Sequence, residues 1–274
     1  MDAPELGKLY ESMAAQFASG GLKTQEIQQL SRGFDLLGPK VHPFRFDQYE
    51  EPFPPAAVRL VVVPLQRQPV LMAHLTKLAA EVRAVLPTGC QSFSNPPPRY
   101  HCTVFHTSQP SDPRPNPLAE DGGTHLSVAP AARPSPSGAI LQQESKTIQD
   151  IAAAEPPFYL EVHSIVFAAS GTLLLCSTDP SGTLNHIRAK LRHAFPGHPT
   201  KQTSIAHTTL LRVLTPQQLP AETSTAIQHI CQEHTASLCG TKISVDRLWY
   251  IIEEVFSTIE GPQQDCLLQQ CPSE

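Results

Sequence analysis

Two short stretches of the sequence carry a histidine and a threonine two residues apart. Residues 204–214 are mostly apolar or β-branched, which favours a strand, and they include His207 and Thr209. Because successive side chains of a strand point to opposite faces, these two residues share one face and Arg212 is predicted on the other. Residues 100–107 repeat the pattern with His101 and Thr103. Each stretch therefore presents an imidazole and a hydroxyl side by side.

These residue types suit proton transfer around an anionic group. The ordinary pKa of histidine, about 6.5, makes both the neutral and the protonated form accessible near neutrality, so one imidazole can accept a proton while another donates one. A threonine hydroxyl can donate a hydrogen bond to an oxygen on which negative charge builds. Two such pairs facing each other would supply a base, an acid and two hydroxyl donors.

The bare triplet His-x-Ser/Thr is a weak signal. It also begins at His74, His106, His125 and His198. Of these, His106 follows His101 by five residues and is predicted on the opposite strand face, and the others fall in a helix, a low-complexity segment and a proline turn. Only His101 and His207 are followed by threonine at i+2 and by an apolar residue, Val104 or Leu210, at i+3 within a strand.

The two stretches also occupy matching places in an internal repeat. Each follows a predicted strand and a predicted helix. The ranges are residues 59–64, 69–86 and 100–107 in one unit, and residues 172–177, 181–195 and 204–214 in the other. Repeated units that direct equivalent residues inward predict two pseudo-symmetric lobes facing a shared cleft.

Two strand-borne His-x-Thr-hydrophobic motifs, one in each half of a duplicated chain, resemble those of the 2H phosphoesterase superfamily. The motifs read His101-Cys102-Thr103-Val104 and His207-Thr208-Thr209-Leu210, and the resemblance extends over about residues 57–256. It implies two lobes whose central strands line a concave groove. It also implies catalysis by His101 and His207, phosphate binding by Thr103 and Thr209, no metal or other cofactor, and a substrate with a cyclic phosphate or an RNA 2',5' or 3' end.

We predict an α+β fold with two pseudo-symmetric lobes, whose mainly antiparallel sheets line a central groove with the helices outside. The duplicated domain spans residues 57–256, between an N-terminal helical extension over residues 1–56 and a loose polar tail over residues 257–274. Residues 109–140 are rich in proline, and we expect a disordered surface insertion, because such a composition buries too little apolar surface to offset the entropy of ordering. Residues 242–254 are predicted to form one long strand.

Three further side chains near the motifs are candidate substrate contacts. Tyr100 and Phe105 can stack on a base and Lys201 can contact a phosphate, although aromatic residues in strands more often belong to the core. Cys102 lies between two site residues, but its side chain is predicted to point to the other face of the strand. We therefore assign Cys102 to packing and not to nucleophilic attack.

Composition narrows the class of protein. The 274 residues carry a formal net charge of −5, which disfavours a broad nucleic-acid-binding surface and still allows a local basic pocket. No apolar run reaches the length of about eighteen residues that a membrane span needs, and the first residues lack the pattern of a secretory signal. The seven cysteines include no Cys-x-x-Cys pair and indicate reduced thiols. We expect a cytoplasmic or nuclear monomer with no membrane partner.

The predicted function is that of a metal-independent phosphodiesterase, which opens a cyclic phosphate on a nucleotide or an RNA end. The duplicated sequence does not distinguish which histidine is the base and which the acid. Two alternatives keep the same fold: a 2',5' RNA ligase-type activity, and a binding module that holds a nucleotide or RNA end without turnover. A zinc site built from His101, His106 and His207 is disfavoured, because a fourth ligand is missing and His106 is predicted to face the other way.

Overall fold

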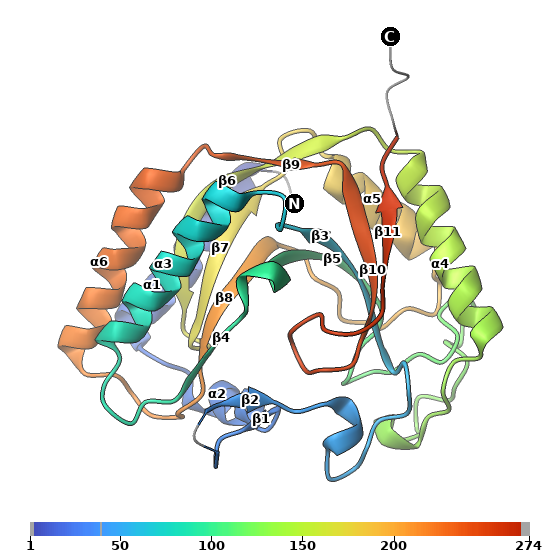
Figure 1. Cartoon of the computed structure of the whole chain (residues 1–274), viewed down its shortest axis with the longest axis horizontal. Helices are drawn as coiled ribbons and strands as arrows, with labels where there is room; N and C mark the ends of the chain where they lie inside the picture. The colour runs from blue at the N-terminus through green and yellow to red at the C-terminus, as the bar shows by residue number, and fades with distance from the viewer. Residues whose placement is uncertain (1–2, 39, 270–274) are drawn as a thin grey trace.

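A computed structural model, which describes residues 3–38 and 40–269, shows one curled antiparallel sheet with helices on its outer side (Figure 1). The α-helices are α1 (Ala3–Gly20), α2 (Thr24–Ser31), α3 (Pro69–Val85), α4 (Gly138–Ala153), α5 (Thr183–Ala194) and α6 (Ala221–Leu238). The strands of the curled sheet are β3 (Val58–Pro64), β4 (Ser92–Ser94), β5 (His101–Ser108), β6 (Phe158–Ala168), β7 (Thr172–Thr178), β8 (Ala206–Val213), β9 (Lys242–Val245), β10 (Arg247–Glu253) and β11 (Gln263–Leu267). A separate two-stranded ribbon pairs β1 (Phe34–Asp35) with β2 (His42–Pro43).

The nine-stranded sheet is built from two halves. One half has the strand order β11-β10-β3-β5, and the other has the order β8-β7-β6-β9 with β4 beside β8. The halves meet where β5 pairs antiparallel with β8 through Cys102 and Thr208. The α+β class and the mainly antiparallel sheets are therefore confirmed, and the sheets of the two lobes are continuous with each other.

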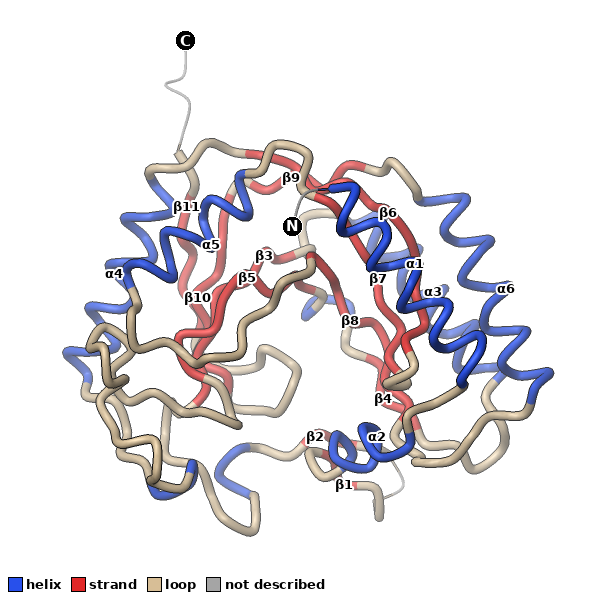
Figure 2. The backbone as a smooth tube through the Cα atoms, turned by 180° about the vertical axis from the view of Figure 1, so that it is seen from behind, coloured by secondary structure: helices blue, strands red, loops and turns tan. Residues whose placement is uncertain are grey.

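The connections between strands cross from one half of the sheet to the other. Helix α3 follows β3 but packs against α6 and β8, whereas α5 follows β7 but packs against α4 and β5. The predicted strand over residues 242–254 is interrupted at Asp246, so that β9 pairs with β6 at one end of the sheet and β10 pairs with β3 near the other. These exchanges make each half depend on the other, and Figure 2 shows the two helical groups flanking the curled sheet.

Local sequence explains the elements that position the motif strands. All seven residues of β3 are buried, and after Arg59 they form an apolar run that ends at Pro64. Helix α3 begins with Pro69, whose fixed φ suits a first helical turn, and buries a stripe that includes Leu71, Leu75 and Leu78. The predicted hairpin between β6 and β7 turns at Gly171, whose φ of 74° favours glycine.

The N-terminal segment is part of the folded unit. Helix α1 packs on β6 and β7, and the buried hydroxyl of Tyr10 donates to the carbonyl of Ser177 at 2.7 Å and accepts from the main-chain N–H of Ala206 at 3.2 Å. The segment that follows lies across the open side of the curled sheet (Figure 1). It contacts one half through the ring pair Phe34–Phe93 and the other through a hydrogen bond from the Phe46 N–H to the Glu254 carbonyl.

Two predictions about irregular segments are corrected by the structure. Residues 109–140 are not disordered: they include a short 3-10 helix (Pro130–Ala132) and the start of α4, and Asp112 pairs with both Arg114 and Arg133, two arginines that are only 6 % exposed. Composition did not predict this order because buried ion pairs stabilise the segment together with a few apolar contacts, such as that of Leu118 with the main core. The tail predicted over residues 257–274 includes β11, which pairs with β10 and buries Cys266. Residues 270–274 lie outside the described part of the chain.

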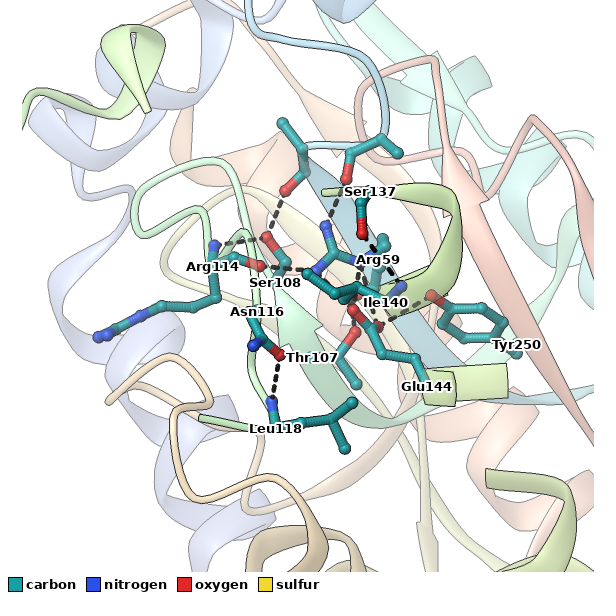
Figure 3. Close-up of polar contacts among 12 residues, drawn as sticks. Arg59, Thr107, Ser108, Arg114, Asn116, Leu118, Ser137, Ile140, Glu144 and Tyr250 are labelled. Carbon is teal, nitrogen blue, oxygen red and sulfur yellow. Dashed lines mark hydrogen bonds and ion pairs between the residues drawn. The ribbon is translucent and has the colours of Figure 1, made fainter. Parts of the chain in front are cut away.

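A fully buried ion pair attaches the insertion and α4 to the sheet (Figure 3). The Arg59 guanidinium, on β3, donates to both carboxylate oxygens of Glu144 on α4 and to the carbonyl of Arg114 in the insertion. The Tyr250 hydroxyl, on β10, donates to the same carboxylate at 2.9 Å. One buried cation thus joins three segments that are distant in the sequence.

No helix within the described ranges combines the length and the apolar character needed to cross a lipid bilayer.

We predict that Glu144→Gln destabilises the protein by about 3–5 kcal/mol, because it leaves the Arg59 charge buried without a counter-ion. The matched control is Asp150→Asn on the same helix, which breaks the exposed Lys146–Asp150 pair and should cost less than about 1 kcal/mol. Chemical denaturation of both variants measures the two free energies. Equal losses in the two variants would contradict the role assigned to the buried pair.

Candidate functional site

A cavity of about 250 Å³ lies on the face of the sheet opposite the packed helices, at the junction of the two halves. His101, Thr103, His207 and Thr209 all line it. The structure therefore brings both predicted His/Thr pairs to one pocket. Further polar residues that line it are Asn95, His106, Thr203, Arg212, Glu253 and Ser257.

The pairing between the two motif strands accounts for this convergence. Cys102 and Thr208, the middle residues of the two triplets, pair directly with each other across the seam. In an antiparallel register this pair places His101 opposite Thr209 and Thr103 opposite His207. Each histidine of one half therefore neighbours the threonine of the other half, and all four side chains share a face.

Both motif strands contain a β-bulge at the apolar residue that ends the motif. On β5, Thr103 pairs with Val62 and Phe105 with Val61, so Val104 has no partner in the ladder. On β8, Leu210 is bypassed in the same way, between Thr209 and Leu211. A bulge inserts one residue and shifts the alternation of all side chains that follow it.

The bulges correct two sequence predictions. His106 and Arg212 each lie five residues after a motif histidine, and strict alternation predicted both on the opposite face. Because one residue is bypassed in each strand, both lie on the same face as the motif and line the pocket. The sequence signal that was missed is the pair of buried apolar residues that follows each triplet, Val104-Phe105 and Leu210-Leu211.

The His101 imidazole is oriented by a main-chain carbonyl. Its Nδ1 lies 2.8 Å from the carbonyl oxygen of Arg99. Because a carbonyl can only accept a hydrogen bond, Nδ1 carries the proton and the neutral ring keeps its lone pair on Nε2. This contact fixes both the tautomer and the orientation of the ring.

All three histidines in the pocket resist protonation. Burial lowers the pKa of His101 and of His106 to about 4. Burial lowers the pKa of His207 to about 3, with further lowering by the positive charge of Arg212. The hydrogen bond to the Arg99 carbonyl opposes this effect for His101. In the ligand-free protein at neutral pH, all three rings are therefore neutral.

Arg212 supplies a positive charge at the edge of the pocket. Its guanidinium donates to the Ser257 hydroxyl at 2.8 Å, and burial lowers its pKa to about 10 while the nearby Glu253 raises it. The Glu253 carboxylate accepts hydrogen bonds from the main-chain N–H groups of Thr258 and Ile259. The β10–β11 loop thus folds around this carboxylate, and burial raises the pKa of Glu253 to about 7.

Several polar atoms of the pocket residues are buried without a hydrogen-bond partner among the described residues. They are Asn95 Oδ1, His106 Nδ1, His207 Nδ1 and Arg212 Nε. Most buried polar groups in native proteins are paired, because an unpaired one costs about 1–3 kcal/mol. Such a concentration in one cavity is typical of a site that completes its hydrogen bonds with a ligand.

The other candidate residues lie elsewhere. Tyr100 and Phe105 are almost fully buried in the main hydrophobic core, so neither is available to a ligand in the pocket. Lys201 is exposed and is not among the residues that line the cavity. Cys102 is buried in the core on the other face, as predicted. No group of three or more His, Cys, Asp or Glu side chains within residues 3–38 and 40–269 is arranged to hold a metal ion.

The chain is similar to known proteins in part of its sequence and in its structure. Residues 112–228 match the model of the 2'-5' RNA ligase superfamily, a range that includes the triplet at His207 but not the one at His101. No curated protein matches the sequence. The chain is similar in structure to TT0787 of Thermus thermophilus, at 16 % identity and a TM-score of 0.44, over 71 % of this chain and 87 % of that one.

Two other solved structures have a comparable TM-score and sequence identity. LigT of E. coli, in complex with NADP+, has 14 % identity and a TM-score of 0.40, over 78 % of this chain and 95 % of its own. Usb1 of Kluyveromyces marxianus has 11 % identity and a TM-score of 0.43, over 78 % of this chain and 99 % of its own. The resemblance predicted from the two His-x-Thr motifs is confirmed by the family match: residues 112–228 match the 2'-5' RNA ligase superfamily, the 2H phosphoesterases.

Proposed function

We propose that the protein is a metal-independent phosphodiesterase that opens a cyclic phosphate on a nucleotide or an RNA end. The observation that carries the proposal is the convergence of His101, Thr103, His207 and Thr209 on one pocket from the two halves of the sheet. Hydrolysis of a cyclic phosphate needs one proton transfer from water and one to the leaving sugar oxygen. Two histidines can supply both transfers.

The phosphate is held between the motif strands. The Thr103 and Thr209 hydroxyls donate to its non-bridging oxygens, where negative charge builds in the transition state. Arg212 adds a positive charge, and its buried Nε–H has no partner among the described residues. Asn95 Oδ1 is likewise unpaired, while its amide nitrogen donates to the Thr209 carbonyl at 3.0 Å. Asn95 therefore accepts a hydrogen bond from a hydroxyl, an amino group or a water of the bound substrate complex.

The surroundings of the two histidines support different roles. The Arg212 and Arg188 charges both oppose the protonation of His207 and keep it available as the general base, whereas for His101 the Arg212 charge is countered by the hydrogen bond to the Arg99 carbonyl, which favours protonation. His101 is the general acid, because its Nδ1–H is fixed on the Arg99 carbonyl and its Nε2 can carry the proton to be donated. Water loses a proton to His207 and forms the new P–O bond, and the leaving oxygen takes the proton of His101 as the old bond breaks.

The negative charge of the substrate favours protonation of the histidine that acts as the general acid. The ligand-free pocket holds neutral histidines, whereas the acid must be protonated before reaction. An anionic phosphate placed between the rings favours the protonated form and raises the histidine pKa. Substrate binding is therefore coupled to the uptake of a proton, and the enzyme charges its acid only when the pocket is occupied.

The size of the site supports a terminal or small substrate. Its volume, about 250 Å³, lies below the roughly 300–1,000 Å³ typical of pockets that enclose a whole small ligand. The segment between α2 and β3 also crosses the open side of the sheet (Figure 1). We propose that one phosphate and its sugar enter the pocket, as in a mononucleotide or the last nucleotide of an RNA.

We predict that His101→Ala and His207→Ala each reduce turnover of a 2',3'-cyclic nucleotide by about 10²–10⁴-fold, because each removes one proton transfer. His229→Ala on the exposed face of α6 is the matched control and should retain full activity. The assay compares a cyclic mononucleotide with a short RNA ending in a cyclic phosphate, with and without a chelator.

Near-full activity in either histidine variant would contradict the paired mechanism. Tight binding of the cyclic nucleotide by the wild-type protein, with no turnover of any substrate, would support the binding module instead. Loss of activity on addition of the chelator would contradict metal independence.

We also predict that sulfate, a tetrahedral anion that does not titrate near neutrality, binds more tightly as the pH falls from 8 to 5. The histidine pKa values lie near 3–4 without a ligand and rise with the anion bound. Because sulfate binding takes up one proton, the affinity for sulfate falls by up to tenfold for each unit by which the pH increases. Calorimetric titration across this range measures the slope. A pH-independent affinity would contradict the coupling, and the double variant His101→Ala/His207→Ala should abolish the slope.

A further inference from the structure

A buried arginine from outside the motif strands connects the two strands. β5 and β8 share a single residue pair, so the main-chain groups beside the seam need other partners. Arg188, on α5, donates from Nε to the Val104 carbonyl at 3.1 Å. One of its terminal nitrogens donates to the carbonyl of Thr103 at 3.2 Å and to that of Ile205 at 2.8 Å. The guanidinium thus bridges the bulge of β5 to the entry of β8.

The carbonyls that accept from Arg188 lie in or next to the two motifs. Val104 is the bulged residue of the first motif and has no partner in the pairing of β5 with β3. Ile205 lies two residues before His207. A planar guanidinium presents several N–H donors in a fixed geometry, which a lysine cannot reproduce. Arg188 therefore links the two strands by side-chain hydrogen bonds at the place where their main chains share only one residue pair.

The burial of this side chain argues against a simple packing role. Arg188 is only 3 % exposed, and the residues before and after it on the same helix face are apolar: Leu184, Ile187 and Leu191. A buried cation is costly, and an apolar residue of similar volume often fills such a place at no loss of stability. The retained charge also acts on the site, because it lowers the pKa of His207.

We propose that Arg188 is a positioning residue of the pocket: by holding the β5 bulge to the start of β8, it sets the spacing of the two His-x-Thr pairs. The inference rests on the proposed function. Its consequence is that Arg188 contributes to the rate without contacting the substrate. A displacement of about 1 Å between reacting groups can cost about 10²-fold in rate, so a small opening of the seam should reduce turnover strongly.

The test compares Arg188→Met, which keeps the volume without the charge or the donors, with Arg188→Lys, which keeps the charge without the planar fork. The matched control is Arg192→Met, on an exposed position of the same helix. Three measurements are made on each variant: the free energy of unfolding, the titration of the His207 ring by NMR without ligand, and kcat and KM for a 2',3'-cyclic nucleotide. The NMR arm also follows the binding of inorganic phosphate.

We expect Arg188→Met to lower kcat by about 10²-fold with a much smaller change in KM, and Arg188→Lys to recover part of this loss. The pKa of His207 should rise in Arg188→Met and stay low in Arg188→Lys, because lysine preserves the charge. The other groups acting on His207, Arg212, His101 and His106, are unchanged in both variants. Arg192→Met should match the wild type in all three measurements.

A folded Arg188→Met protein with unchanged kcat and unchanged His207 titration would overturn the proposal. So would a loss of stability in both variants with no change in kcat or in the His207 pKa, since a purely structural residue behaves in this way. If Arg188→Met does not fold, the kcat of Arg188→Lys decides: a kcat below that of the wild type supports the proposal, and an unchanged kcat overturns it. If the wild type turns over no cyclic phosphate, the proposed function fails, and the titration and phosphate binding still test whether Arg188 positions the histidines.

Discussion

The site depends on one strand pair, the contact of Cys102 with Thr208 that joins the two halves of the sheet. Each of these residues is the centre of a His-x-Thr triplet, so the pair that closes the sheet also places each histidine beside the threonine of the other half. A shift of one strand by one residue in this register would turn its motif side chains toward the core. The exchanged helices and the divided strand at Asp246 hold the halves in this register from both sides.

The two halves are similar in their backbone and different in their charge. Both motif strands bulge at the residue after the threonine. Both also place in the pocket the residue that lies five positions after the motif histidine, which is His106 on β5 and Arg212 on β8. The arginine lies on the strand of His207 and opposes the protonation of both His207 and His101. The acid and base roles that the sequence left open are proposed from the different surroundings of the two rings: the Arg188 charge acts on His207, and the Arg99 carbonyl orients His101.

Sequence patterns predicted what depends on local periodicity. The two motif strands, the helices that precede them and the shared pocket follow from alternation and repeat. Alternation could not place His106 or Arg212. A bulge leaves the sequence pattern almost unchanged, but it reverses the sheet face on which the following side chains lie. Composition could not predict the order of residues 109–140, because the carboxylate of Asp112 and its arginine partners act across turns of the chain. Arg188 and Asn95 were missed because their partners are main-chain carbonyls of distant strands, which no spacing reveals.

The central claim is that one phosphate is held between the twin histidines at the seam. The most direct measurement is a crystal structure of the wild-type protein with a nucleoside 2'- or 3'-monophosphate. The account predicts the phosphorus atom between the His101 and His207 rings, with its oxygens within hydrogen-bond distance of Thr103 and Thr209. A phosphate bound on another surface, or two imidazoles turned away from an occupied pocket, would contradict it.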